Sequence, residues 1–209
     1  MKSILSGFAI VLVLSLTSCG GSSTKGNAST TDSTKVATPA AAPAAAAPTM
    51  TVNEADWVEQ DMSTISPLEP VTLKLPKGVK MEKNGNGGVD IHISDFYMIT
   101  VGTNASSSIK EAMDGDKSLG VNNTTSYQNG KLVLDEPNGF IATYQMKDEA
   151  NGTKYQPETH FAYYLIKDGA IYTIMDQRPL DNFSVAGSAY SEDIAKKVYA
   201  IVKASAKVK

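Results

Sequence analysis

Apolar and polar side chains alternate along much of the chain from residue 66 onward, and this period of two is typical of strands half-buried in a β-sheet. Asn-Gly and Asp-Gly pairs separate several of the alternating segments and supply the left-handed backbone that hairpin turns need. The expected strands are residues 71–75, 89–94, 96–101, 131–134, 140–146, 160–166 and 170–175. Because neighbouring strands are joined by short turns, the pattern predicts an antiparallel meander.

Two segments carry a helical pattern instead. Ser108 followed by Glu111 forms a capping box and predicts a short helix over residues 109–113. Ser191 precedes a segment in which one face collects Ile194, Val198, Ile201, Val202 and Ser205. A helix with one apolar face needs an apolar surface to cover. We therefore expect an α+β fold: an antiparallel β-sheet meander with a short helix and a C-terminal amphipathic helix packed on one sheet.

The order of these elements, together with the turn Leu75-Pro76-Lys77-Gly78, resembles the PsbP-like domain. The resemblance covers residues 66–207. It implies an α/β/α sandwich of the kind that occurs in photosystem accessory proteins and in a nuclear-transport factor. Because members of that family are mostly accessory or binding proteins, the resemblance implies binding without naming a ligand.

The first 20 residues have a different character. Lys2 precedes a mostly apolar run over residues 4–16, which is typical of a secretory signal and too short for a stable transmembrane helix. Leu16-Thr17-Ser18-Cys19 resembles the bacterial lipobox, in which the cysteine is lipidated and the chain is cut before it. This resemblance implies a signal peptide at residues 1–18 and a lipid anchor on Cys19, each buried CH₂ adding about 0.8 kcal/mol of membrane affinity.

Composition changes again between the cysteine and residue 50. Residues 20–38 are rich in Gly, Ser and Thr, and residues 39–48 consist of alanine and proline. Neither stretch has enough large apolar side chains to offset the entropy of ordering its backbone. We expect residues 19–49 to be the lipidated cysteine followed by a disordered tether, and residues 50–209 to be a single domain.

Charge and cysteine content exclude some classes of function. The chain of 209 residues has net charge −3, and residues 50–209 carry 16 basic and 21 acidic side chains, a net −5. Arg178 is the only arginine. A nucleic-acid binder needs a dense basic surface, so this class is not expected. One cysteine allows neither an internal disulfide nor a multi-cysteine metal site.

No catalytic motif is visible. His92 and His160 are the only histidines, and neither lies in a Gly-x-Ser-x-Gly turn or at a metal-ligand spacing. A hydrolase would need one of them beside an exposed serine and an aspartate. Asp114-x-Asp116-x-Ser118 resembles the start of a calcium loop, but Leu119 stands where that loop needs glycine, so a solvated helix end is favoured. We expect no cofactor and no metal.

Three side chains are candidates for ligand or partner contacts. Trp57 precedes the first clear strand and either seals the edge of the sheet or contacts a partner. Tyr164 points away from Phe161 and Tyr163 by alternation, either to pack or to line a ligand surface. Arg178 ends a strand and is either an anion-binding group or half of a salt bridge.

Together these features predict a lipoprotein of the bacterial cell envelope, its domain facing the periplasm or the cell surface. Its partners would be the bilayer, through acylated Cys19, and an unknown envelope protein or small ligand bound without catalysis. Two alternatives stay open: an envelope hydrolase that uses His92 or His160, and a structural or assembly component of the envelope.

The lipid anchor is testable in cells. Cys19→Ser should abolish incorporation of labelled palmitate, because no other side chain of the chain offers a thiol for the thioether. Gel autoradiography of wild type and variant measures this. Label retained by the variant would refute the anchor.

Overall fold

The computed structural model describes residues 50–150, 152, 154–178 and 188–209. The signal peptide, Cys19 and the tether lie outside the described residues, and so remain predictions. The described elements are the short 3₁₀ helices η1 (Glu54–Asp56), η2 (Met62–Thr64) and η4 (Ser188–Tyr190), the strands β1 (Trp57–Asp61), β2 (Val71–Pro76), β3 (Lys80–Lys83), β4 (Val89–Ser94), β5 (Tyr97–Asn104), β6 (Tyr127–Glu136), β7 (Gly139–Met146), β8 (Glu158–Lys167), β9 (Ala170–Gln177) and β10 (Lys207–Val208), and the helices α1 (Ile109–Leu119) and α2 (Glu192–Ser205).

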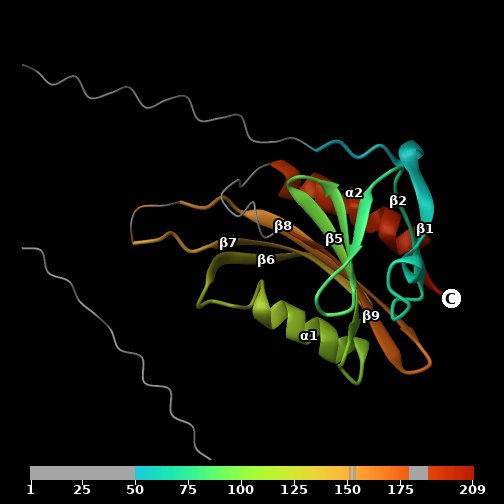
Figure 1. Ribbon diagram of the computed structural model, residues 1–209. Helices are drawn as coiled ribbons and strands as arrows, with labels where there is room; N and C mark the ends of the chain where they lie inside the picture. The colour runs from blue at the N-terminus through green and yellow to red at the C-terminus, as the bar shows by residue number, and fades with distance from the viewer. Residues whose placement is uncertain (1–49, 151, 153, 179–187) are drawn as a thin grey trace, which may run out of the picture. The chain divides into compact units, whose positions relative to one another are not determined.

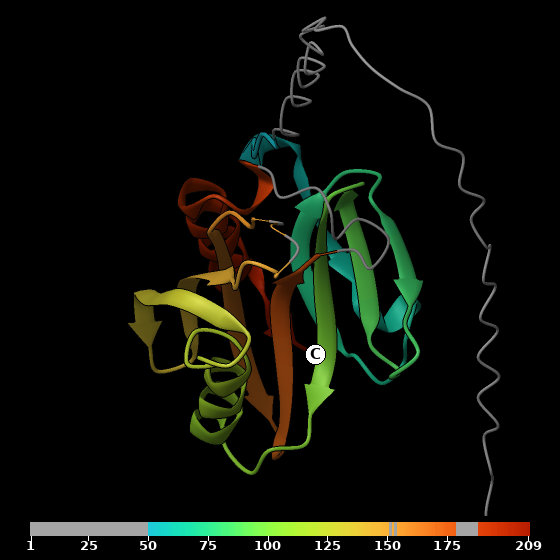
Figure 2. The ribbon, with the colours of Figure 1, turned by 90° about the vertical axis from the view of Figure 1, so that its left-hand side faces the viewer.

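Antiparallel strands and two helices make this an α+β fold, as the pattern predicts, but the strands form two sheets rather than one. A three-stranded sheet has the order β1-β2-β10, and a seven-stranded sheet has the order β3-β4-β5-β9-β8-β7-β6. The larger sheet is built from two meanders, β3 to β5 and β6 to β9, connected through α1. β9 pairs with β5, so that the last strand of the second meander closes against the first (Figure 2).

The two helices lie on opposite sides of the large sheet (Figure 1). On one face, α2 and the small sheet bury the main core, to which alternate residues of β5 contribute Tyr97, Ile99 and Val101. On the other face, Ala112 and Met113 of α1 cover a smaller cluster over β7, β8 and β9. Because both faces of β8 are covered, its central residues are apolar on both sides, whereas β4 alternates.

Helix α1 is longer than predicted. Ser108 caps it by accepting a hydrogen bond from the Glu111 amide at 3.2 Å, as the capping box requires. The Glu111 carboxylate reaches the Ser107 amide at 2.8 Å. The helix then continues past residue 113 to Leu119, so the acidic residues 114 and 116 lie within a helix and not in a calcium loop.

Helix α2 matches its prediction. Ser191 accepts a hydrogen bond from the Ile194 amide at 3.4 Å, and Ile194, Val198, Ile201 and Val202 are buried against the large sheet. None of the described helices has the length and apolarity that a membrane span requires.

One Asn-Gly pair does not make a hairpin. Asn129 has φ 57° and lies inside β6, where the pairing with β7 shifts between Gln128 and Lys131. The left-handed residue therefore creates a β-bulge within a long strand. An Asn-Gly pair has the same local conformation in a hairpin turn and in a β-bulge. Only the long-range pairing with β7 shows that this pair forms a bulge.

Two glycines allow a test of this packing. A Cβ on Gly139 would lie 2.9 Å from the Ala162 carbonyl oxygen and would also meet the Tyr199 ring, whereas a Cβ on Gly115 in α1 would meet nothing within 4 Å. Gly139→Ala should lower the free energy of unfolding by about 1–3 kcal/mol. Gly115→Ala should raise it by roughly 0.5–1 kcal/mol, because alanine favours the helix. Urea denaturation measures both, and equal effects would contradict the tight packing at β7.

Candidate functional site

The candidate site lies where β8 and β9 separate. Their ladder runs from Lys167 opposite Ala170 to Ala162 opposite Met175 and ends there. One residue further on, the Asp176 carboxylate takes the place of a backbone acceptor, because the Phe161 amide donates to its Oδ1 at 2.9 Å. A side-chain oxygen of β9 thus accepts the hydrogen bond that a backbone carbonyl would accept if the ladder continued.

Asp176 is buried, and its carboxylate connects three strands. Its Oδ2 accepts a hydrogen bond from the Tyr97 hydroxyl of β5 at 3.1 Å. His160 Nδ1 of β8 lies 3.4 Å from Oδ1. Since a buried carboxylate without donors is very unfavourable, these contacts hold β5, β8 and β9 together at this point.

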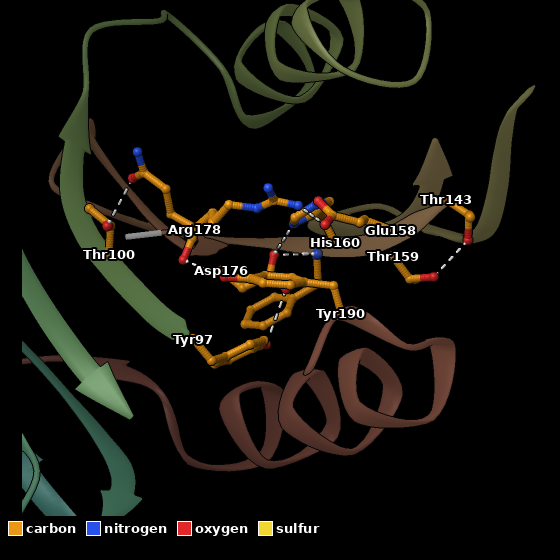
Figure 3. A network of polar contacts seen from close by, with 11 residues as sticks. Tyr97, Thr100, Thr143, Glu158, Thr159, His160, Asp176, Arg178 and Tyr190 are labelled. Atoms are coloured by element: carbon orange, nitrogen blue, oxygen red, sulfur yellow. Dashed lines mark hydrogen bonds and ion pairs between the residues drawn. The ribbon is translucent and has the colours of Figure 1, made fainter. Parts of the chain in front are cut away.

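His160 is enclosed by two rings and two carboxylates, as Figure 3 shows in part. Tyr144 stacks on one side, with ring centroids 5.1 Å apart, and Tyr190 lies on the other at 4.8 Å. Its Nε2 is 3.4 Å from Glu158 Oε2, while Nδ1 faces Asp176. Each ring nitrogen therefore has an acidic neighbour from the protein itself.

Arg178 completes the network (Figure 3). Its guanidinium pairs with Glu158 and stands 5.9 Å from the centre of the Tyr190 ring. Tyr190 in turn donates to the Gln177 carbonyl oxygen at 2.9 Å. Burial lowers the pKa of Arg178 below its ordinary value. It also raises the pKa values of Tyr97, Tyr144 and Tyr190, so these hydroxyls stay protonated at neutral pH.

A cavity of about 210 Å³ adjoins this network beneath the C-terminal end of α1. Its wall is mainly apolar and aromatic, with acceptor oxygens from Asp116 and Asp176. The lining residues are Asp116, Leu119, Gly120, Val121, Phe140, Tyr144, His160, Phe161, Ala162, Met175 and Asp176. The Asp116 carboxylate accepts a hydrogen bond from Tyr164 at 2.5 Å, and burial raises its pKa. The cavity therefore suits a small apolar group that carries a hydrogen-bond donor.

The structure separates the two histidines. His160 lies in this network, whereas His92 lies on β4 at the surface, where its Nε2 is 2.8 Å from Glu82 Oε1 of the neighbouring strand. His92 therefore takes no part in the site. No serine, threonine or cysteine in the described ranges forms a hydrogen bond to His160, so nothing there resembles the triad that a hydrolase would need. Across the same ranges no group of acidic, histidine or cysteine side chains is arranged to hold a metal.

Two of the three candidate contact residues are not available to a ligand. Trp57 is only 6% exposed and packs into the main core from β1, so the role that fits is sealing the edge of the small sheet. Tyr164 is fully buried under α1, which fits the alternative that it packs and not the one that it lines a ligand surface. Arg178 does lie at the site, in a salt bridge with Glu158.

Asp176 and Glu158 were not among the candidates from sequence. A signal for Asp176 was present, because it occupies the same phase of β9 as the buried Tyr172 and Ile174. A carboxylate in the buried phase of a strand requires donors from other elements. The sequence could not identify those donors, since Tyr97 lies 79 positions away.

A double-mutant cycle tests the Glu158–Arg178 pair. Glu158→Gln or Arg178→Met alone should lower the free energy of unfolding by roughly 2–4 kcal/mol, because each removes the opposite charge from a partly buried ion pair. The double variant should cost less than the sum of the two.

The exposed pair Lys110–Asp114 on α1 is the matched control. Lys110→Met and Asp114→Asn should show a coupling below about 0.5 kcal/mol. A coupling of that size for Glu158 and Arg178 would mean that the network does not hold the strand ends.

Comparison with known proteins adds little to this description. No protein-family model and no curated protein sequence matches the chain. Among solved structures, the Saccharomyces cerevisiae Ran-binding protein Mog1p is similar with a TM-score of 0.44 and 12% sequence identity, over 73% of this chain and 95% of the yeast chain. This is a weak likeness, and the α+β assignment stands on the strands and helices described above.

Proposed function

We propose that this chain is a bacterial envelope lipoprotein whose domain binds a small ligand without catalysis. The N-terminal part of the proposal rests on sequence: a signal-like segment at residues 1–18, then Cys19, then a Gly/Ser/Thr and Ala/Pro tether. The net charge of −5 on residues 50–209 keeps the domain away from anionic lipid headgroups. Such a domain would stand off the membrane and be free to bind.

The observation that carries the binding role is the cavity beneath α1. Its apolar wall favours a ring, and the Asp116 carboxylate, which accepts one hydrogen bond from Tyr164, favours a donor on that ring. A carboxylate on the ligand would meet Asp116 and Asp176 and be repelled. We therefore expect a neutral or cationic aromatic group that bears a hydroxyl or N–H.

A hydrolase that uses His160 is the second candidate, because His160 lines the cavity and faces Asp176. A general base needs a ring nitrogen that reaches the substrate or nucleophile. Glu158 already faces the nitrogen that points away from Asp176. The geometry therefore supports binding better than catalysis, with His160 acting as a wall of the cavity.

Phenol is a suitable probe for the cavity. Titration of the purified protein, followed by amide chemical shifts, should perturb Gly120, Val121 and Ala162. Anisole, which lacks the donor, should bind more weakly, because it forms no hydrogen bond with the Asp116 carboxylate. Benzoate should not bind.

Val121→Phe should weaken phenol binding by about tenfold or more, because the new ring occupies the cavity. Val58→Phe, the same change at an exposed valine of β1, is the control and should bind phenol as the wild type does. Unchanged binding by Val121→Phe, or shifts spread over the whole surface, would refute the site.

A further inference from the structure

A second cavity, of about 270 Å³, lies on the same side of the large sheet between β5, β9, the β3–β4 turn and the segment before β2. Met175 lines both cavities and stands between them. The lining residues are Leu68, Glu69, Asn84, Asn86, Gly88, Thr100, Gly102, Thr103, Asn104, Thr173 and Met175. Amide and hydroxyl side chains thus take the place of the aromatic wall of the first cavity.

Glu69 has a hydrogen-bonding requirement that the described residues do not meet. The side chain is 2% exposed, and its Oε1 accepts bonds from the amide and the hydroxyl of Thr103, both at 3.1 Å. Its Oε2 is buried and has no partner in the part of the chain that the structure describes. Burial raises the pKa of Glu69, and its two hydrogen bonds with Thr103 oppose that rise only in part. A donor from outside the chain would remove this deficit.

The surroundings favour a positively charged donor. No lysine, arginine or histidine is among the residues that line this cavity. Asp90 stands behind its wall and accepts hydrogen bonds from Asn84 at 2.9 Å and Thr100 at 3.0 Å. Two carboxylates without a basic side chain on the wall create a negative potential, and the net charge of the domain has the same sign. A neutral polyol would bond to Oε2 but would leave the charge in place.

A metal ion fits this cavity less well than an amine. Glu69 is its only acidic lining residue, and the described residues contain no group of three acidic, histidine or cysteine side chains suited to an ion. Calcium and magnesium take several oxygen ligands, usually with more than one carboxylate. An ammonium group needs only a few acceptors, and carboxylate, amide and hydroxyl oxygens are all present on the wall.

We propose that this cavity binds a small aliphatic primary amine, whose ammonium group forms a salt bridge with Glu69 Oε2. Glu69 lines the cavity, and because the terminal torsion of a glutamate is soft, a small rotation that keeps Oε1 at Thr103 would turn Oε2 toward the amine. Amide and hydroxyl oxygens of the wall accept the remaining N–H bonds, while Leu68 and Met175 contact the aliphatic stem. This amine site is separate from the cavity beneath α1, and it does not depend on the function proposed for that cavity.

Titration with n-pentylamine at neutral pH, followed by amide chemical shifts of the purified protein, tests the proposal. The amides of Gly102, Thr103 and Thr173 should shift in a saturable manner, and n-pentanol at equal concentration should shift them much less, because it leaves the charge of Glu69 uncompensated. Glu69→Gln should weaken amine binding about 10- to 100-fold, because a charged hydrogen bond is lost. Glutamine keeps an oxygen for both Thr103 bonds.

A second variant tests the cavity without touching Glu69. A Cβ on Gly102 would meet nothing within 4 Å, and β-branched residues favour strands, so Gly102→Val should fold and block the cavity. It should reduce amine binding at least about tenfold. Glu54→Gln, at an exposed carboxylate, is the control and should bind amine as the wild type does.

Other outcomes would overturn the proposal. Equal weakening by Glu54→Gln and Glu69→Gln would mean that the amine only screens surface charge. Amine binding that survives both Glu69→Gln and Gly102→Val would place the site elsewhere. No saturable shift at Gly102, Thr103 and Thr173 would mean that the cavity holds water only. The phenol titration tests the cavity beneath α1, and its result does not depend on the outcome of the amine titration.

Discussion

The end of the large sheet depends on hydrogen bonds to one buried carboxylate. Asp176 replaces a backbone acceptor for the Phe161 amide, accepts the Tyr97 hydroxyl from β5 and faces His160 of β8. An ionised carboxylate in the interior is tolerated only when several donors surround it. The positions of β5, β8 and β9 at this end are therefore coupled, since none can move away without leaving Asp176 unsatisfied.

The cavity beneath α1 lies beside the point where β8 and β9 separate. Because β8 and β9 separate beyond Ala162, side chains rather than backbone close the gap, and Tyr144 and Tyr190 enclose His160 there. Arg178 and Glu158 neutralise each other beside it. The result is a polar network next to an apolar cavity, a combination that would give a ligand both burial and orientation.

Asp176 and Glu69, the two buried acids of the described residues, differ in one respect that bears on function. Asp176 has donors from the protein for both oxygens, whereas Glu69 has donors for Oε1 only. A satisfied buried carboxylate is structural, because its donors hold the fold together. A buried carboxylate that still lacks a donor beside a polar cavity instead indicates a place for one. For this reason we assign an architectural role to Asp176 and a binding role to Glu69.

Local pattern was sufficient for most elements of this chain. Apolar patterns and turn residues identified β2, β4, β5 and β7 to β9, and N-cap serines identified the starts of both helices, because these features depend on neighbours within a few residues. The division into two sheets was missed, since β1 and the two residues of β10 are strands only through pairing with β2. The length of α1 was missed as well, because Gly115 and the acidic residues beside it disfavour a helix locally.

In the candidate site, too, local sequence pattern did not reveal the contacts between residues far apart in the chain. Sequence alone placed His160 and Arg178 among the candidates and implied the lipid anchor at Cys19, which is a local signal. Tertiary structure decided that Arg178 pairs with Glu158, that Tyr164 and Trp57 are buried, and that Tyr97 and Thr103 supply donors to Asp176 and Glu69. The physical reason is distance along the chain. The sequence can show that a carboxylate is buried and therefore needs hydrogen-bond donors. Only the packing of strands far apart in sequence determines which side chains supply those donors and which carboxylate oxygen has none.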